Sequence, residues 1–456
     1  MELAVALNKI RNTTLFDPLL NRKSGLHIAV AWFAMVAVGV LLLVLAYCLP
    51  NDIIRQHVQQ SLPNIEARWG WEYFPDMPNA QMDLRTDCRM LASAVYDGKE
   101  PLLERVMGAY SLKSEKLGME QVDLLRATLG EADDAVLDEY PRYWHGYLVP
   151  LRLLLLFGDY FSVLYCAGAI LLLLIVLLAY LLVKKHETAM LPPLVVTLLL
   201  ASPVSLVMST QYHAVTFIML LSLLAGVCLK DRLKGHWGLV FFVLGGIVNY
   251  FDFFTFPLLA LGPLLVLFLS TMGDDIPWQK QVLNVALAAL LWFLGYGLMW
   301  VSKWILASVV LHKNVIEDAS KQVAVRSSNV VAHGYGQLAN GKHFSHLRTI
   351  LVNGWRIAGS WFNALVIIAY PVVFGIWAQK RRSKGEEGTR LARFPRCKLP
   401  ALIAIALLPL IWAFAVSNHT YTHSTFTYRI FLVSIFCVLY IPSYIMSHTS
   451  VGHECP

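Results

Sequence analysis

Acidic, basic and imidazole side chains recur in this sequence at the borders of long apolar runs, and such side chains can move protons and hold phosphate. In QMDLRTDCRML, Asp83 and Asp87 are four residues apart and would share one face of a helix. In NHTYTHSTFTYR, Arg429 closes a polar stretch just before an apolar run. The other candidates for binding a substrate are Arg142, His145, His213, Asp252, Lys303, Asn418, His419, His423 and Tyr428.

Each of these candidates also has a purely structural interpretation. Asp252 could cap the helix that follows it, and Lys303 could extend to the membrane surface instead of contacting a phosphate. His419 and His423 have the i, i+4 spacing of metal ligands, but the sequence indicates no third ligand. The two aspartates of the first motif could be solvated charges on a surface helix. The convergence of these residues on one side of the membrane is stronger evidence for a site than any one of them alone.

The composition identifies the protein class. Of the 456 residues, 57% are hydrophobic and 15% are charged, and the mean hydropathy is +0.56. Backbone polar groups cannot go unpaired in lipid, so apolar runs of this length must cross the membrane as helices and not as barrel strands. The sequence therefore predicts an all-α integral membrane protein with about ten transmembrane helices of roughly 20 residues each. They are expected near 27–49, 160–183, 190–208, 213–229, 237–251, 254–271, 282–312, 355–378, 400–416 and 428–447.

Lysine and arginine predict the orientation of these spans. Basic residues precede the first span, and others lie at 184–185, at 230–234 and in the dense run 380–398. The positive-inside rule places them in the cytoplasm of a multi-pass cell-membrane protein with both termini cytoplasmic. The net charge of +7 then reflects this bias, so the lipid bilayer is an expected partner and nucleic acid is not.

The same topology divides the chain into segments. We expect a cytoplasmic N-terminus at 1–26, a retained first span at 27–49 and an extracytoplasmic loop of amphipathic helices at 50–150. A multi-span bundle follows at 151–447, with a second outer loop at 313–352 whose Gly, Asn, Ser and His content suits a mobile cover over a site. The basic loop 379–399 and the tail 448–456 are expected in the cytoplasm. All candidate residues then lie at the outer face, where an ionisable group at membrane depth indicates function.

This order of features resembles the GT-C superfamily of integral-membrane glycosyltransferases. The blocks TDCRML, RYWHGYLVPLR, NYFDFFTFPLLALG, GYGLMWVSKW and NHTYTHSTFTYR are similar to those of a little-characterised group of bacterial multi-span membrane proteins, and the similarity covers most of the chain. The resemblance implies transfer of a sugar from a polyprenyl-phosphate-linked donor. The acceptor would be a cell-envelope glycan, lipid or protein at the extracytoplasmic face.

The resemblance also implies roles for particular residues. An outer-loop carboxylate would take the proton of the acceptor hydroxyl, with Asp87 the first candidate, Asp83 the second and Asp52 the third. Asp52 is closest to the first span, where such enzymes often carry this residue, whereas the other two lie in the more distinctive motif. The leaving phosphate would be stabilised by fixed cations, and a guanidinium fork ranks Arg429 first. The accompanying candidates are His423, Arg142 and His145. A divalent cation such as Mg²⁺ or Mn²⁺ would suit a phosphate leaving group, but the sequence does not require one.

Two other functions share these features. A transporter or flippase of lipid-linked saccharides would hold the same phosphate without breaking a bond, and a surface-polysaccharide polymerase or ligase would differ mainly in its acceptor. Transporters often show internal repeats and binding groups near the membrane midplane. The sequence contains no evident repeat and few midplane charges, which favours the transferase.

Overall fold

The computed structural model describes residues 19, 24–67, 74, 76–118, 120–333, 337–383 and 393–448, and only the backbone at 331–333, 337–342 and 381–383. The predicted N-terminal segment 1–26 and the tail 448–456 lie almost wholly outside the described residues. So does the middle of the predicted basic loop 379–399.

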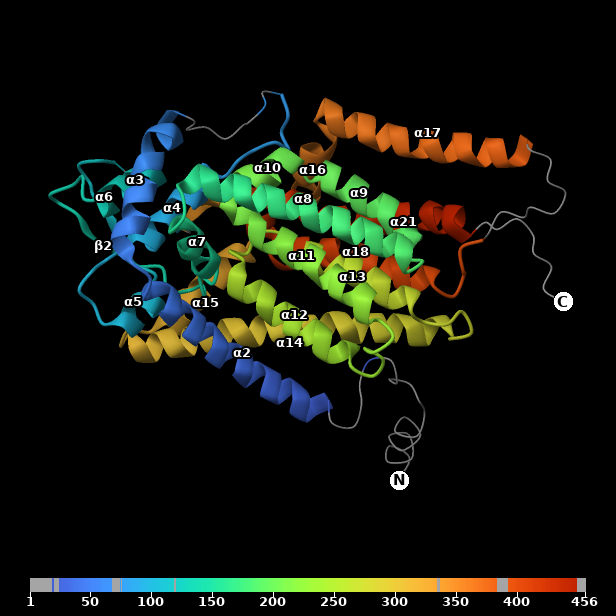
Figure 1. Cartoon of the computed structure of the whole chain (residues 1–456), viewed down its shortest axis with the longest axis horizontal. Helices are drawn as coiled ribbons and strands as arrows, with labels where there is room; N and C mark the ends of the chain where they lie inside the picture. The colour runs from blue at the N-terminus through green and yellow to red at the C-terminus, as the bar shows by residue number, and fades with distance from the viewer. Residues whose placement is uncertain are drawn as a thin grey trace.

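The described chain is a bundle of long apolar helices that run side by side (Figure 1). Helices of 18 residues or more, apolar enough to cross a membrane, begin near six of the predicted spans. They are α2 (Ser24–Tyr47), α8 (Tyr160–Lys184), α11 (Thr210–Leu229), α14 (Trp278–Val310), α17 (Trp361–Ser383) and α21 (Leu432–His448) with the turns before it. The shorter apolar helices are α9 (Leu191–Leu200), α12 (Trp237–Phe251), α13 (Leu258–Ser270) and α18 (Leu399–Ala415). The protein is thus an all-α, multi-pass membrane protein, and the number of ten spans stays a prediction.

The outer helices of the bundle present apolar side chains away from the protein. On α8, Leu172, Leu173 and Val176 are 59–65% exposed, and α17 is almost entirely unburied along its apolar length. A water-soluble protein rarely exposes apolar surface over such a length, whereas lipid tails cover it without cost. These faces are therefore lipid-facing.

The segment predicted as the first outer loop gathers at one end of the bundle, on the left of Figure 1. It contains α3 (Asn51–Ala67), α4 (Leu84–Val95), α5 (Leu102–Gly108), α6 (Gln121–Thr128), and β1 (Ser111–Lys113) paired antiparallel with β2 (Val136–Asp138). The last helix of this segment, α6, ends at Thr128, and Gly130, with a φ of +88°, turns the chain out of the helix before β2. This segment buries its apolar faces in one hydrophobic cluster with the adjoining ends of α2, α7 (Leu148–Leu155), α12 and α14.

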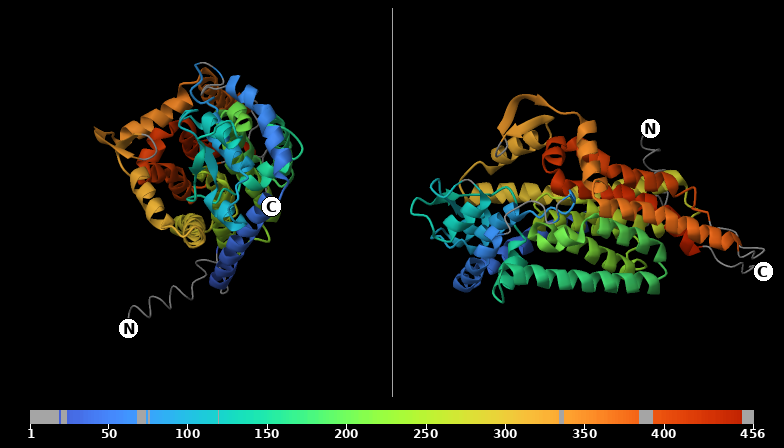
Figure 2. Two further views of the ribbon diagram at one scale, coloured as in Figure 1. Left: turned by 90° about the vertical axis from the view of Figure 1, so that its left-hand side faces the viewer. Right: turned by 90° about the horizontal axis from the view of Figure 1, so that it is seen from above.

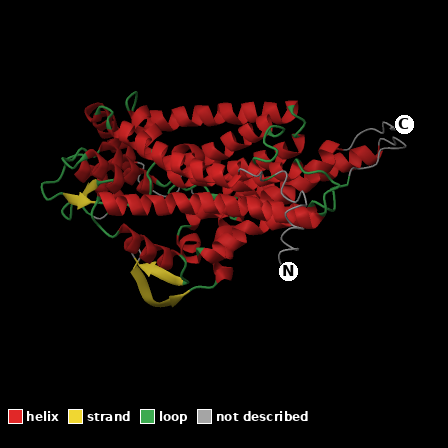
Figure 3. Cartoon of the chain, turned by 90° about the horizontal axis from the view of Figure 1, so that it is seen from below, coloured by secondary structure: helices red, strands yellow, loops and turns green. Residues whose placement is uncertain are grey.

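The second predicted outer loop also consists largely of regular elements. It contains α15 (Val315–Arg326), β3 (Val330–His333), β4 (Gln337–His343) and α16 (His346–Ala358). Side chains cap the two helices, since Asn314 accepts from the amide of Glu317 and Ser345 accepts from the amide of Arg348. The β3–β4 pair stands out from the side of the bundle in both views of Figure 2, and Figure 3 shows how little strand accompanies the helices.

Short helices break the chain between the spans at the end where α3 to α6 lie. They are α10 (Pro203–Met208), α19 (Ser417–Thr422), α20 (Ser424–Thr427) and the 3₁₀ turn η2 (Tyr428–Phe431). At the other end, next to the 3₁₀ turn η1 (Thr188–Met190), ion pairs join the connections between helices: Lys230 with Glu187, and Lys398 with Asp274. One end of the bundle therefore consists of short, broken helices, whereas ion pairs join the connections at the other end.

Candidate functional site

The two aspartates of the first motif lie at the start of α4. Asp83 is the N-cap of this helix, and its carboxylate accepts hydrogen bonds from the amide and the hydroxyl of Thr86, both at 2.9 Å. The backbone amide of Asp83 donates to Ser209 Oγ at 2.8 Å, which ties the start of α4 to the residue before α11. The carboxylate of Asp83 thus caps the N-terminus of α4.

Asp87 lies one turn further and is fully buried. Its two oxygens accept from the amide of Thr210 at 2.9 Å, the amide of Gln211 at 3.0 Å, the hydroxyl of Thr210 at 2.6 Å and the hydroxyl of Tyr160 at 2.5 Å. Those two amides are the first of α11, so a side chain of α4 caps a transmembrane helix 123 residues further along the chain. Burial raises the pKa of Asp87 to about 6, against the effect of these hydrogen bonds.

Arg429 is fully buried and caps the C-terminal end of a helix. Its Nε donates to the carbonyl of Ala201 at 2.9 Å, and its Nη2 donates to Ser205 Oγ at 2.7 Å. Ala201 is the C-cap of α9, where backbone carbonyls lack helical partners. The guanidinium also lies over the rings of Tyr212, at 4.3 Å, and Tyr428, at 4.6 Å. Its donors are therefore directed at the protein itself.

Two further buried cations also donate to carbonyls near the C-termini of helices. Lys303 donates from Nζ to the carbonyl of Met107 at 2.9 Å, in the last turn of α5. Arg152, which the sequence analysis did not single out, donates to the carbonyls of Ala46 and Ala94, in the last turns of α2 and α4. A cation near a helix C-terminus is favoured by the partial negative charge of the free carbonyls. Lys303 neither extends to the membrane surface nor faces open space.

Several other predicted residues bond to backbone carbonyls or have no part in a shared site. His213 bonds through Nε2 to the carbonyl of Val207 at 2.9 Å, and the amide of Asn418 donates to the carbonyl of Val330. The hydroxyl of Tyr428 donates to Ala201 and Asn79 carbonyls. Asp52 lies in the first turn of α3 and is exposed, unlike Asp83 and Asp87.

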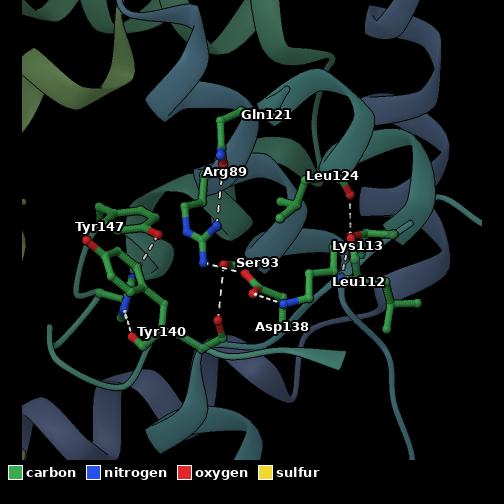
Figure 4. Close-up of polar contacts among 12 residues, drawn as sticks. Arg89, Ser93, Leu112, Lys113, Gln121, Leu124, Asp138, Tyr140 and Tyr147 are labelled. Atoms are coloured by element: carbon green, nitrogen blue, oxygen red, sulfur yellow. Dashed lines mark hydrogen bonds and ion pairs between the residues drawn. The ribbon is translucent and has the colours of Figure 1, made fainter. Parts of the chain in front are cut away.

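A polar network in the outer segment fixes the chain from residue 138 to residue 147 (Figure 4). Arg89 of α4 donates to Asp138 at 2.6 Å and lies 4.6 Å from the centre of the Tyr140 ring. His145 has a φ of +58° and bonds to the carbonyl of Tyr140 at 2.7 Å and to the hydroxyl of Tyr147 at 3.0 Å. Burial and the nearby Lys303 charge hold the pKa of His145 well below its usual range, so this ring is neutral.

Arg142 follows directly on this anchored stretch and opens onto a hollow at the protein surface. Its guanidinium lies 4.8 Å from the Tyr140 ring centre, and its Nη1 donates to Asp318 Oδ2 at 2.7 Å. The hollow lies between three elements, which are the 142–143 segment, the outer end of α14 and α15. Its lining residues are Arg142, Tyr143, Trp300, Trp304, Ala319, Gln322, Val323 and Arg326.

The donors in this hollow are not used up by the protein. Arg326, at the end of α15, forms no ion pair with a carboxylate among the described residues. The indole Nε1 of Trp300 is buried and has no hydrogen-bond partner in the part of the chain that the structure describes. Unpaired buried donors are uncommon, and each one calls for a partner. A hollow rich in donors suits an anionic ligand with several acceptor oxygens.

His419 contacts Arg326, and His423 lies beside His419. Arg326 Nη1 donates to His419 Nδ1, and because a guanidinium only donates, the proton of His419 must be on Nε2, which donates to the carbonyl of Phe254 at 2.7 Å. The rings of His419 and His423 lie 4.8 Å apart. Burial, followed by the Arg326 charge, lowers the pKa of both rings, that of His423 to about 3. Both rings are therefore neutral, and His419 orients a cation without itself supplying one.

Asp252 follows α12, is 4% exposed and precedes two aromatic residues that pack on the lining of the hollow. It accepts from the amide of Thr255 at 2.9 Å and from its hydroxyl at 2.5 Å, and burial raises its pKa to about 7. The next two rings reach the hollow, since Phe253 packs on Tyr143 and Phe254 packs on Trp300, with ring centres 5.3 and 5.1 Å apart. A carboxyl group of this pKa can exchange a proton at neutral pH.

The tertiary structure thus divides the predicted residues into groups. Arg142 lines the hollow, His419 contacts its lining residue Arg326 with His423 beside it, and Asp252 precedes two rings that pack on the lining. In contrast, Asp83, Asp87 and Arg429 cap the ends of α4, α11 and α9. Arg326, Trp300 and Asp318 were not predicted, and no local signal marks them, because an arginine in the last turn of a helix and a tryptophan in a span are ordinary. No cluster of three or more metal-binding side chains is present among the described residues. No protein-family model, curated protein or solved structure matches the chain.

Proposed function

We propose that this protein is a membrane glycosyltransferase that takes a sugar from a polyprenyl-phosphate-linked donor and transfers it to an envelope glycan, lipid or protein at the extracytoplasmic face. The observation that carries the proposal is the hollow lined by Arg142, Arg326 and Trp300 together with two further aromatic residues, where the Trp300 indole N–H has no partner among the described residues. Fixed cations and N–H donors stabilise the negative charge that grows on a leaving phosphate. Aromatic faces suit the apolar sides of a sugar ring.

The position of the hollow supports a donor that is itself a lipid. Trp300 and Trp304 belong to α14, which is apolar enough to cross a membrane, and the neighbouring Val301, Ile305 and Val309 are 42–66% exposed. A polyprenyl tail would lie along that apolar surface while its phosphate reaches the arginines. Such a surface requires no special residues, since the tail is recognised only by its apolarity.

Within the proposed reaction, Asp252 is our first candidate for the base and Asp52 the second. The pKa of Asp252 near 7 and its place behind the hollow support the first choice, and the exposure of Asp52 supports the second. The base takes the proton of the acceptor hydroxyl as that oxygen attacks the anomeric carbon and the phosphate leaves with the bonding electron pair. The hydrogen-bond partners of Asp83 and Asp87 lie outside the lining of the hollow, whereas the two residues after Asp252 pack on that lining, which lowers the claim of Asp83 and Asp87 to this role.

The test compares a deletion strain with strains that carry wild type, Arg326→Gln, Asp252→Asn or Asp52→Asn at matched protein levels. Lys321→Gln is the control, because Lys321 is an exposed cation on the same helix as Arg326. Surface glycans and lipid-linked sugars are measured by mass spectrometry. We expect deletion and Arg326→Gln to remove one sugar from the envelope and to accumulate its lipid-linked donor, and Lys321→Gln to behave as wild type.

The side on which the donor accumulates separates transfer from transport. Periodate that cannot cross the membrane oxidises a donor waiting at the outer face of intact cells, and a donor left at the inner face is protected. Accumulation of an accessible donor supports the transferase. Accumulation of a protected donor identifies a transporter, and an unchanged envelope in the deletion strain contradicts the proposal.

A further inference from the structure

One carboxylate faces the cations of the hollow. Asp318, in the first turn of α15, accepts from Arg142 Nη1 at 2.7 Å. It therefore occupies donors that a phosphate oxygen would need, because carboxylate and phosphate present similar acceptor oxygens to a guanidinium. Arg326 and the Trp300 indole have no such internal acid.

The helix that carries Asp318 has a shallow attachment to the rest of the protein. Of its residues, only Val315 and Ala319 are buried. Its polar attachments include the Asp318–Arg142 pair, the exposed pair of Lys313 with Glu139 just before it, the hydrogen bond from the amide of Val315 to Ser308 Oγ at 3.1 Å, and the contact of Arg326 with His419. A segment with few buried apolar contacts opens more readily than the core around it.

The hollow is also too narrow for a phosphate ester while α15 is in this position. The free space between its side chains is enough for about one water molecule. A ligand of the proposed kind must therefore move α15 or its side chains to enter. The side chains of Arg142 and Asp318 are 23% and 46% exposed, so water can reach the pair, and breaking it does not leave a charge in an apolar interior.

We propose that Asp318 is an internal counter-ion which the phosphate group of an incoming lipid ester displaces from Arg142, so that α15 is an exchangeable lid and Asp318 weakens the affinity of the site for its anion. The inference rests on the proposed function for the phosphate as ligand, but it concerns binding and requires no sugar transfer. In the bound state Arg142 holds the phosphate together with Arg326 and the Trp300 N–H. Asp318 then turns toward water, where its charge is solvated.

The experiment measures binding of dodecyl phosphate to the purified full chain in non-ionic detergent by titration calorimetry, with dodecanol as the uncharged probe and inorganic phosphate as the probe without a tail. We expect Asp318→Asn to bind dodecyl phosphate about two- to fivefold more tightly than wild type, the range that an exposed ion pair contributes. Glu317→Gln is the matched control, because Glu317 precedes Asp318 in the same first turn but pairs with Lys321. It removes the same charge from the same helix end and should leave the affinity unchanged.

A double-mutant cycle locates the effect. In an Arg142→Gln background, Asp318→Asn should no longer tighten binding, because the displaced partner is absent. If Asp318→Asn binds as wild type does or more weakly, if neither protein binds, or if Glu317→Gln gives the same gain, the inference is wrong. If inorganic phosphate shows the same gain as dodecyl phosphate, the exchange stands and the lipid tail is not recognised at this site.

The result is separable from the test of the proposed function. Tighter binding in Asp318→Asn without any envelope phenotype in the deletion strain would keep the exchange and reject the transferase. Sugar transfer with no effect of Asp318→Asn on binding would keep the transferase and reject the exchange.

Discussion

Two groups of charged residues at the same end of the bundle are used in opposite ways. Around α11, the donors and acceptors of Asp87 and Arg429 are directed at the free amides and carbonyls of helix ends. Around the hollow, Arg326 and the indole of Trp300 keep donors that no carboxylate among the described residues takes up. Buried charge alone therefore does not indicate a site, and what the charged groups contact distinguishes the two groups.

The difference follows from how membrane helices end. A helix that ends or breaks inside a protein leaves up to four amides or carbonyls without partners, and burial makes each of them costly. The chain breaks near α10 and between α19 and η2, so this end of the bundle needs many capping groups. Charged side chains supply the strongest hydrogen bonds available for that purpose.

Replacing Arg326 by glutamine gives the largest expected effect and tests the hollow. Removal of one fixed cation from a site of this kind costs about 10² in turnover. Because Arg326 is only half-buried, the unfolding temperature should stay near that of wild type. Sugar transfer is measured in membranes of the complemented strain, with Lys321→Gln beside it. Equal turnover in the two variants would remove Arg326 from the site.

Replacing Arg429 by glutamine tests the capping group. The substitution leaves the carbonyl of Ala201 and the hydroxyl of Ser205 without their charged donor, which costs about 2 kcal/mol of unfolding free energy. Thermal unfolding in detergent measures the loss, and activity per folded molecule should remain close to wild type. A stable variant with lost activity would instead place Arg429 in the site, as the sequence alone suggested.

Asp87 predicts a dependence of stability on pH. Burial raises its pKa in the folded protein to about 6, above the value of an unfolded aspartate, so the folded state holds its proton more tightly. The stabilisation that this tighter proton binding gives the folded state is complete below about pH 4 and is lost as the pH rises through 6. Relative to Asp87→Asn, the wild type should lose about 1 kcal/mol or more across this window. Parallel thermal unfolding of both proteins from pH 4 to 7 gives the difference, and a constant difference would contradict the raised pKa.

His419 tests the support of Arg326. Glutamine can accept from Arg326 and donate to the carbonyl of Phe254 at once, whereas phenylalanine can do neither. We expect His419→Phe to weaken binding of dodecyl phosphate about tenfold, and His419→Gln to stay within about threefold of wild type. Calorimetry on the purified chain distinguishes the two. Equal losses in both variants would mean that packing, and not orientation of the guanidinium, is what His419 provides.

The sequence predicted much of the architecture and part of the site. The apolar runs form helices, the segment 50–150 gathers at one end of the bundle, and Arg142, Asp252, His419 and His423 were named in advance. The interpretation of 313–352 as a flexible cover missed α15, whose pattern is too short and too polar to stand out. The ranking of Asp87, Asp83 and Asp52 as candidates for the base rested on the resemblance and on position along the chain, which do not reveal what a carboxylate contacts.

By itself the sequence determined that this is a helical membrane protein, because apolarity, helical length and the need to pair backbone groups in lipid act within each segment. Tertiary structure alone decided which charged groups can contact a ligand and which cap helices. The partners of Asp87 lie 123 and 124 residues away, and the partner of Arg326 lies 93 residues away. Whether a charged group caps a helix or faces an open hollow depends on contacts between distant segments, and no local pattern in the sequence encodes them.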